Sequence, residues 1–348
     1  MQNAANDNVI RLDARREPRR CVATTTTGRP CRNHAVDGGE YCRVHRRPQA
    51  GATAESSSEP PITDELADLG AGPSAIDRLQ AFMGRRLKGD YPIDEFGYDE
   101  ELTREILIPL LRPLYERYFR VRTLGINRIP NEGPALLVAN HSGTIPIDAV
   151  MMQYAVATEH PAERAVRSVG ADLVWTTPFV SHLARKTGNA VACDEDAFAL
   201  LERDQLVAVF PEGFKGVGKG WSERYRLQRF GRGGFIEVAL RARVPIIPVA
   251  IVGAEEAFPM VGNAKALASL LRLPYFPITP TFPLLGALGL IPLPSRWVIE
   301  FGEPIAMDKY PQDAADDKMF VFDLTDSIRD RIQQMVYKGL KYRGGTFL

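Results

Sequence analysis

A histidine and an aspartate follow the same short apolar run. His141 comes directly after Leu136–Asn140, and Asp148 follows it after a short loop. Pro134 and Gly143 bound the run, which is typical of a buried strand. In α/β sheets the chemistry lies at the carboxyl ends of such strands. A neutral imidazole there can accept a proton near pH 7, and a carboxylate can hold its ring, so the pair predicts a general base.

A second apolar run ends in a similar way. Leu206–Val209 leads into Phe210, Pro211, Glu212 and Gly213. A single histidine at a strand end is more often a core residue that a local carboxylate satisfies. The second strand end of the same form favours a reactive site over that structural interpretation.

The chain beyond this second strand end is basic and rich in glycine. Its cations are Lys215, Lys219, Arg224, Arg226, Arg229 and Arg232. Positive charges directly after a reactive strand suit an anionic ligand such as a phosphate or a coenzyme A tail. Lys215, Lys219 and Arg232 are therefore candidate anion-binding residues. The alternative is a solvated loop.

Three cysteines and a histidine lie close together near the N-terminus: Cys21, Cys31, Cys42 and His45. They make a complete tetrahedral set for Zn2+ with no open position, which indicates a structural zinc ion. His34 is a further candidate ligand, and the alternative is a group of unpaired surface thiols. The first residues contain no apolar signal sequence, so we expect a cytoplasmic chain, where crowded cysteines favour metal over disulfides.

Composition divides the chain of 348 residues into four parts. We expect disorder over 1–19, the zinc-binding module over 20–47, a linker rich in small residues and proline over 48–73, and the main domain over 74–342. Arginines flank the zinc module, but its sequence identifies no partner for it. The formal net charge is +0, so we expect no nucleic acid to be drawn to the protein by its overall field.

The main domain alternates strand-like apolar runs with helical spacing. Beyond the two strands above, one strand is expected from Val121 up to the turn at 131–134, and others near 165–169, 190–193, 243–252 and 297–301. Helices are expected at 74–86, 98–120, 177–185, 197–206 and 323–341. This order predicts an α/β fold with a mixed, mostly parallel sheet flanked by helices.

A segment near the C-terminal end of the domain has no charged residue. Leu273–Ser295 is apolar throughout but contains six prolines, which exclude a continuous membrane-spanning helix. Two interpretations remain open. The segment lies on the surface and dips into lipid headgroups through Phe282, Leu284 and Leu288, or it is buried under the domain.

These blocks, in this order, resemble the glycerolipid acyltransferase family, which includes the lysophosphatidic acid acyltransferases. They are the His and Asp pair, Phe-Pro-Glu-Gly at 210–213, Phe-x-x-Gly at 230–233 and Val-Pro-Ile-Ile-Pro-Val at 244–249. The resemblance covers roughly residues 121–305, and the tail resembles an actinobacterial subgroup with an uncertain acceptor. It implies transfer of a fatty acyl group from acyl-CoA or acyl carrier protein to a hydroxyl of a lipid acceptor, with peripheral contact at the inner face of the cell membrane.

The resemblance also implies roles for individual residues. His141 matches the general base and Asp148 the residue that orients it. Phe210, Pro211, Glu212 and Gly213 match the acceptor-binding block, and the Gly213 N–H is a candidate donor to the oxyanion of the tetrahedral intermediate.

The chain departs from the family in the spacing of its pair. The family has His-x4-Asp, whereas this chain has His-x6-Asp with Pro146 in the place of the aspartate. A loop at 143–145 can absorb the additional residues and bring Asp148 to the ring. The spacing also leaves open a catalytically degenerate scaffold that acts as a zinc-bearing membrane adaptor.

A second departure concerns the acceptor. Family members that use phosphate-bearing acceptors carry an arginine shortly after the glycine that corresponds to Gly188, whereas this chain has Asp194 and Glu195 there. We therefore expect a neutral alcohol, such as a diacylglycerol or a long-chain alcohol. A serine hydrolase is a third interpretation, but the chain has no Gly-x-Ser-x-Gly sequence and Ser142 lies directly beside His141.

Overall fold

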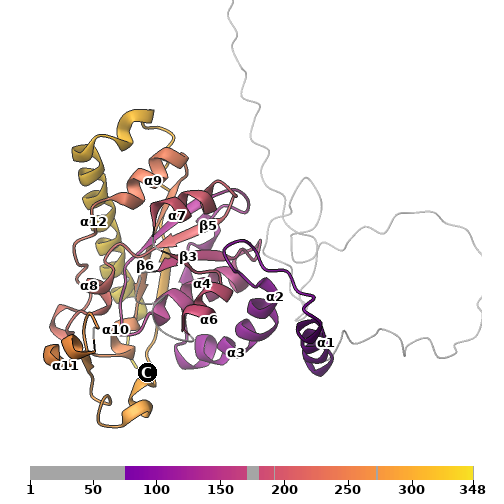
Figure 1. Ribbon diagram of the computed structural model, residues 1–348. Coiled ribbons are helices and arrows are strands. Elements are labelled where there is room, and N and C mark those ends of the chain that lie inside the picture. The colour runs from indigo at the N-terminus through magenta and orange to yellow at the C-terminus, as the bar shows by residue number, and fades with distance from the viewer. Residues whose placement is uncertain (1–74, 171–179, 192, 272, 348) are drawn as a thin grey trace, which may run out of the picture. The chain divides into compact units, whose positions relative to one another are not determined.

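The structure is a computed structural model that describes residues 75–170, 180–191, 193–271 and 273–347 (Figure 1). All of them belong to the compact unit Ala71–Leu348. The expected zinc ligands Cys21, Cys31, Cys42 and His45 and the expected linker lie outside the described residues.

Seven strands form the central sheet in the order β1-β9-β6-β2-β5-β3-β4. Their bounds are β1 Arg122–Leu124, β2 Ala135–Ala139, β3 Val166–Gly170, β4 Ala190–Val191, β5 Leu206–Val209, β6 Ile246–Val252 and β9 Val298–Phe301. Only β6 and β9 pair antiparallel among these neighbours. The expected mixed, mostly parallel sheet is confirmed.

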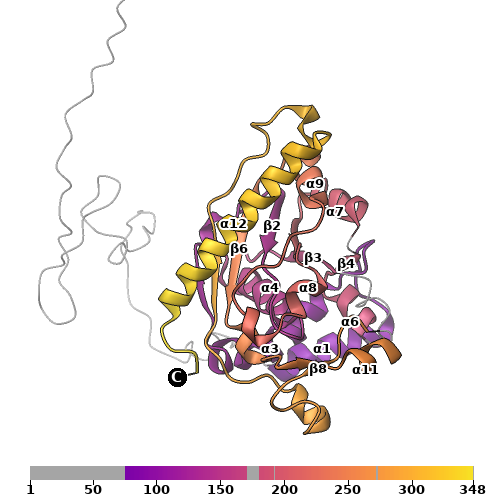
Figure 2. The same ribbon diagram turned by 90° about the vertical axis from the view of Figure 1, so that its left-hand side faces the viewer.

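Both faces of the sheet are buried, as continuous apolar strands require. In β2, Leu136 and Val138 point into one core cluster, while Leu137 and Ala139 point into the other. The first face is covered by α7 (Asp194–Leu201), α9 (Gly234–Ala242) and α12 (Lys318–Arg343), and α12 runs diagonally along it (Figure 2). The second is covered by α4 (Ile147–Glu159) and by the helical segment 100–118.

The helix expected at 98–120 is real, but its hydrogen-bond register changes along its length. It runs through α2 (Glu100–Leu102), the π-helical turn η1 (Thr103–Leu107), α3 (Ile108–Pro113) and a second π-helical turn η2 (Leu114–Tyr118). Two prolines fall inside it and have no N–H to donate, so a regular α-helical ladder cannot continue through them.

The helix expected at 197–206 begins and ends earlier, as α7. Cys193 is its N-cap, and its Sγ accepts from the Asp196 N–H at 3.4 Å. Asp194, Glu195 and Asp196 fill the first turn, where negative charge is favoured by the helix dipole. Cys193 is therefore half-buried at a helix start, and burial raises the pKa of its thiol.

Shorter elements complete the domain. They are α1 (Ala75–Lys88), η3 (Ile126–Arg128), α6 (Val180–Lys186), α8 (Phe214–Val217), η4 (Trp221–Glu223), α10 (Ala254–Ala257), β7 (Gly262–Asn263), α11 (Lys265–Leu270), β8 (Pro277–Ile278), η5 (Gly286–Leu290) and η6 (Gln312–Ala315). β7 and β8 form a small antiparallel pair around α11. The helix expected at 177–185 corresponds to α6, and residues 177–179 lie outside the described part.

The uncharged segment 273–295 lies largely on the surface. Leu284 is 85% exposed and Leu288 67%, whereas Ser295 is buried. The interpretation as a segment buried under the domain is therefore wrong for its central part. Within the described ranges, no helix combines the length and the apolar character that crossing a membrane requires.

Candidate active site

Three neighbouring strands bring the predicted residues to one edge of the sheet. β5, β2 and β6 lie side by side and parallel, so their carboxyl ends meet. Figure 1 shows α8 and α10, which follow β5 and β6, close together at this end. Asn140 fastens β2 to β6, since its Nδ2 donates to the Ile251 carbonyl at 2.9 Å and its Oδ1 accepts from the Ile251 N–H at 2.7 Å.

His141 and Asp148 are in contact. The Nδ1 atom of His141 lies 2.8 Å from Oδ2 of Asp148, and the His141 side chain is 14% exposed while that of Asp148 is fully buried. Asp148 is in the first turn of α4, and its carboxylate also accepts the N–H groups of Ser142 and Ala149. Two backbone N–H groups and a helix start thus hold the carboxylate against one ring nitrogen, which leaves Nε2 for a substrate.

The loop 142–146 absorbs the two additional residues of the His-x6-Asp spacing by folding against α10 and its flanks. The Thr144 hydroxyl donates to the Phe258 carbonyl at 3.1 Å, and the Tyr275 hydroxyl donates to the Thr144 carbonyl at 2.7 Å. Burial, with a contribution from the charge of Asp148, raises the pKa of Tyr275 to about 12. The tyrosine therefore remains a hydrogen-bond donor at neutral pH.

Gly143 is required for this loop, which gives a first prediction. Its φ is +85°, and a Cβ there would lie 2.9 Å from the Ala254 carbonyl oxygen. We expect Gly143→Ala to lower the free energy of unfolding by about 1–3 kcal/mol more than Gly133→Ala. Gly133 is the matched control, because its φ is +76° and no atom lies within 4 Å of the place that a Cβ would take. Equal losses in denaturant unfolding would contradict the steric assignment.

Glu212 faces inward, and this differs from its expected place in an acceptor site. Its side chain is fully buried. One carboxylate oxygen accepts the N–H of His141 at 2.9 Å, and the other accepts the N–H of Gln228 at 2.6 Å. Glu212 therefore fixes the backbone of His141. The Phe210 ring, with its centroid 4.6 Å from that of His141, packs directly against the imidazole.

Lys219 is also buried and paired with protein carboxylates, so the prediction that it binds a ligand anion is wrong. Its side chain is 3% exposed, and its Nζ lies 2.9 Å from Oε1 of Glu255 and 3.5 Å from Oε2 of Glu212. It also donates to the Arg226 carbonyl at 3.2 Å. We call Glu212, Lys219 and Glu255 the Lys219 cluster. Two carboxylates already neutralise the lysine, which leaves no free charge for a ligand.

The electrostatics of the Lys219 cluster follow from its burial. Burial raises the pKa values of both Glu212 and Glu255, and the lysine opposes this effect. Burial alone would lower the pKa of Lys219, but the charges of Glu255 and Glu212 outweigh it and the pKa is raised. The lysine is therefore positively charged at neutral pH and is the shared counter-charge of both carboxylates.

The rest of the Phe-Pro-Glu-Gly block serves mainly structure. The Gly213 N–H donates to the Phe210 carbonyl at 2.9 Å, and the Pro211 carbonyl accepts the Gly231 N–H at 3.1 Å. The expected use of the Gly213 N–H for an oxyanion is therefore wrong in this conformation. Lys215 and Arg232, in contrast, are exposed and free to meet an anionic ligand.

Ser142 does not act as a nucleophile in this arrangement. Its hydroxyl is buried and has no hydrogen-bond partner, and its backbone N–H is the group that contacts Asp148. The serine hydrolase interpretation needs a hydroxyl in reach of the imidazole and open to a substrate, and neither condition holds for Ser142.

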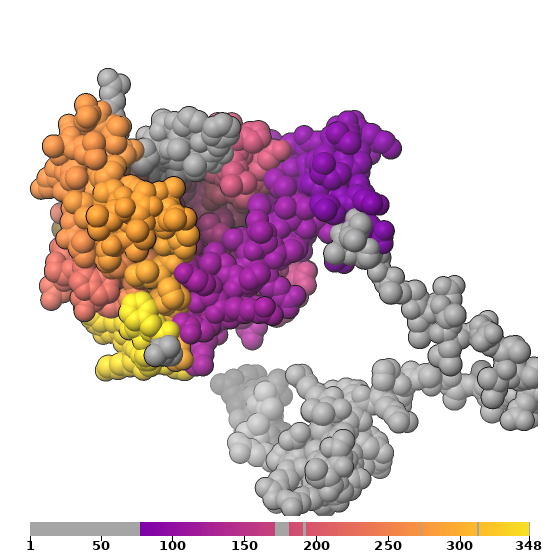
Figure 3. Space-filling model, turned by 90° about the horizontal axis from the view of Figure 1, so that it is seen from below, coloured from indigo at the N-terminus to yellow at the C-terminus, as the bar shows by residue number. Residues whose placement is uncertain are grey.

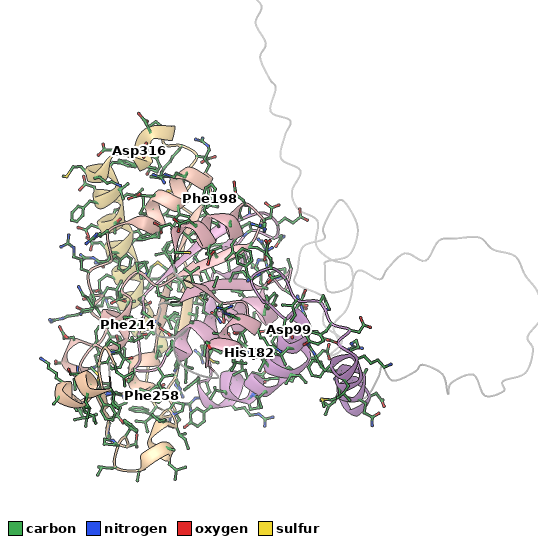
Figure 4. The ribbon with its side chains drawn as sticks, in the orientation of Figure 1. Asp99, His182, Phe198, Phe214, Phe258 and Asp316 are labelled. Atoms are coloured by element: carbon green, nitrogen blue, oxygen red, sulfur yellow. The ribbon has the colours of Figure 1, made fainter. Side chains whose placement is uncertain are left out.

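An apolar cavity of about 180 Å³ adjoins the loop after His141. Thr144 and Ile145 of that loop line it, and Phe258, Tyr275 and Leu290 are among its other lining residues. Phe258 is labelled near the lower end of the domain in Figure 4. The cavity therefore lies at the same end of the sheet as the His141–Asp148 pair.

Sequence reasoning missed Glu255, Asn140 and Tyr275. Glu255 and Glu256 lie in α10, shortly after the end of the long buried strand β6, and both are buried. Glu256 pairs with Arg343 of α12 at 2.7 Å. Two adjacent acids shortly after an apolar strand were the available signal, because such charges are rarely buried without partners.

Known proteins resemble this chain at several levels. A family profile described as Acyltransferase matches residues 120–252, which include His141, Asp148 and the block 210–213. A Mycobacterium tuberculosis protein named "Uncharacterized protein Rv0502" is 49% identical over 303 residues, which are 87% of this chain and 82% of that protein. A Bos taurus protein named "DGAT1/2-independent enzyme synthesizing storage lipids" is 27% identical over 220 residues, or 63% of this chain and 60% of that protein.

Among solved structures, the 1-acyl-sn-glycerophosphate (LPA) acyltransferase PlsC from Thermotoga maritima is similar with a TM-score of 0.46. It is 18% identical and covers 76% of this chain and 90% of its own. The chain therefore belongs to the same family as its mycobacterial relatives, and the Acyltransferase profile matches the part of it that carries His141, Asp148 and the block 210–213.

Proposed function

We propose that the protein transfers a fatty acyl group from acyl-CoA or acyl carrier protein to a hydroxyl of a lipid acceptor. The observation on which this depends is the contact of 2.8 Å between His141 Nδ1 and Asp148 Oδ2 at the sheet edge. The alternative of a degenerate adaptor depends on the His-x6-Asp spacing, and this contact supports the enzyme instead.

In the proposed reaction His141 is the catalytic base. Its Nε2 takes the proton from the acceptor hydroxyl while the oxygen attacks the thioester carbonyl carbon. Asp148 holds the ring and stabilises the imidazolium that forms. The tetrahedral intermediate then expels the thiolate, which takes the proton from the imidazolium. The products are an ester and a free thiol, so atoms and charges balance.

The exposed cations after β5 suit the donor. Lys215 and Arg232 are both exposed, unlike Lys219. We propose that they contact phosphate groups of coenzyme A or of the carrier protein's prosthetic arm. Because such surface contacts involve mobile side chains, their loss should raise the KM for the donor rather than lower kcat.

For the acceptor we propose a neutral alcohol. Arg167 approaches Gly188 and donates to its carbonyl at 2.9 Å, but it is 2% exposed and its guanidinium is paired with Asp94. It is thus unavailable to a phosphate. The name of the Bos taurus relative, which refers to storage lipids, agrees with a neutral acceptor.

The acceptor prediction is tested by a competition assay. The purified chain is incubated with labelled acyl-CoA and equal amounts of diacylglycerol, a long-chain alcohol and lysophosphatidate, and the products are identified by mass spectrometry. We expect label in the neutral products. A preference for lysophosphatidate would reject the neutral acceptor but keep the acyltransferase, whereas no labelled ester with any acceptor or donor would reject the function.

We also propose one structural zinc ion held by Cys21, Cys31, Cys42 and His45, on the basis of their residue types and spacing alone. Metal analysis of the full chain should give one zinc per protein. Cys42→Ser should lower this value, whereas Cys193→Ser, outside the set, should leave it unchanged. An unchanged zinc content in Cys42→Ser would reject the site.

We place the enzyme at the inner face of the cell membrane as a peripheral protein, because a lipid acceptor resides in the bilayer. This location fits the exposed, uncharged surface formed around residues 284–291.

A further inference from the structure

One surface of the domain combines exposed hydrophobic side chains from two segments. We call it the apolar face and define it by Val261, Leu270, Leu284, Leu285, Leu288 and Ile291. Each of these side chains is between 55% and 85% exposed. Scattered exposed leucines are ordinary, but a large contiguous apolar surface marks an interaction site. Figure 3, viewed from below, shows this segment in orange beside a recess in the surface.

The apolar face is built on one small substructure. β7 and β8 pair at Gly262 with Ile278, and the Val261 N–H donates to the Ile278 carbonyl at 2.9 Å. The turn beyond β8 is closed by Thr281, whose hydroxyl donates to the Gly289 carbonyl at 3.1 Å. The leucines are therefore presented by a hydrogen-bonded scaffold. Their exposure is a property of the folded domain.

The apolar face is continuous with the cavity beside the catalytic loop. Leu290 and Leu273 both line the cavity, and both are also open to solvent, at 46% and 36% exposure. Thr144 and Ile145, which follow His141 by three and four residues, also line the cavity. A hydrocarbon chain that enters between these leucines reaches the loop that carries the general base.

From these observations we infer that the apolar face docks on a membrane by inserting its side chains among the lipids, and that it admits a lipid chain to the cavity. The inference rests on the proposed function and names the surface through which its substrate arrives. Because no residue from Leu273 to Ser295 is charged, the contact is hydrophobic. It does not require anionic lipids, and salt does not weaken it.

The test is co-sedimentation of the full chain with vesicles of phosphatidylcholine alone. We expect the wild-type protein to bind in low and in high salt. Leu288→Asp should lower the partition coefficient at least fivefold, and Leu284→Asp/Leu288→Asp at least twentyfold. The matched control is Met319→Asp at the start of α12, because Met319 is 70% exposed and Leu288 67%. It should bind as the wild type does.

Several results would overturn the inference. These are failure of the wild-type protein to bind, equal binding by Leu288→Asp and the wild type, and binding that needs anionic lipid and is lost in Leu87→Asp. The last result would assign the contact to the cationic helix α1. A dimer in sedimentation velocity that Leu288→Asp dissociates, without vesicle binding, would assign the face to a second copy of the chain.

Melting temperatures establish that the variants are folded, which is expected because both substituted leucines point into solvent. Vesicle binding needs no turnover, so it is measured separately from acyl transfer. If binding follows the expected pattern but no ester forms, the docking surface stands and the acyltransferase proposal fails. If esters form but the leucine variants bind vesicles and turn over vesicle-borne acceptor normally, the acyltransferase proposal stands and the docking surface is rejected.

Discussion

His141→Ala is expected to lower kcat/KM for acyl transfer by about 10²–10⁴-fold, the usual contribution of a positioned general base. Asp148→Asn is expected to lower kcat/KM by a comparable factor, because the amide can present its NH₂ group to Nδ1 and favour the wrong tautomer. Both effects should appear in kcat more than in KM, since the imidazole acts on the reacting proton. Steady-state kinetics with saturating donor and acceptor measure the change.

The control for this prediction is Ser142→Ala. The Ser142 hydroxyl is buried without a partner, so its removal costs no hydrogen bond and should leave kcat within about twofold of wild type. A large loss in Ser142→Ala together with an active His141→Ala would contradict the general-base assignment and return the serine to consideration. Circular dichroism of each variant verifies that the fold is retained.

Lys219→Met is expected to have the largest effect on stability. The lysine is the shared counter-charge of two buried carboxylates, at 2.9 Å from Glu255 and 3.5 Å from Glu212. Removing one member of a buried ionic group costs about 3–5 kcal/mol, because the remaining charges are left uncompensated. Equilibrium unfolding in urea measures the loss. Since Glu212 also fixes the His141 backbone, activity should fall with it.

Two further variants isolate the charge effect. Lys215→Met removes a neighbouring but exposed lysine and should change the unfolding free energy by less than about 0.5 kcal/mol. Lys219→Met/Glu255→Gln removes one negative charge together with the positive one and should recover about 1–2 kcal/mol relative to Lys219→Met. No recovery in the double variant would show that the cost comes from packing of the lysine stem.

The pH dependence of stability provides an independent measurement. Burial raises the pKa of Glu255 above its ordinary value of 4.5. A carboxyl group with a raised folded-state pKa contributes stability that is present below its unfolded pKa and is lost as the pH rises through the folded value. Without Lys219 this loss is larger. The stability difference between wild type and Lys219→Met should therefore widen as the pH is raised from about 4.5 towards 7.

The strands of the central sheet, their burial and the place of the reactive pair could be predicted from the amino-acid sequence, whereas the small pair β7 and β8 was not. Apolar runs such as Leu136–Ala139 are buried on both faces because parallel strands in the middle of a sheet are covered on both sides. The residues at their carboxyl ends then meet at one edge. For this reason His141 and the block 210–213 could be assigned to one site from their order and spacing alone.

Which of these groups face a substrate became clear only in the folded chain. Lys219 looks like a free cation in sequence, but Glu255 reaches it from the end of a different strand and neutralises it. Asp148 contacts His141 because Phe258 and Tyr275, far along the chain, hold the intervening loop. Burial and pairing depend on partners that are distant in sequence, so the local sequence pattern cannot predict them.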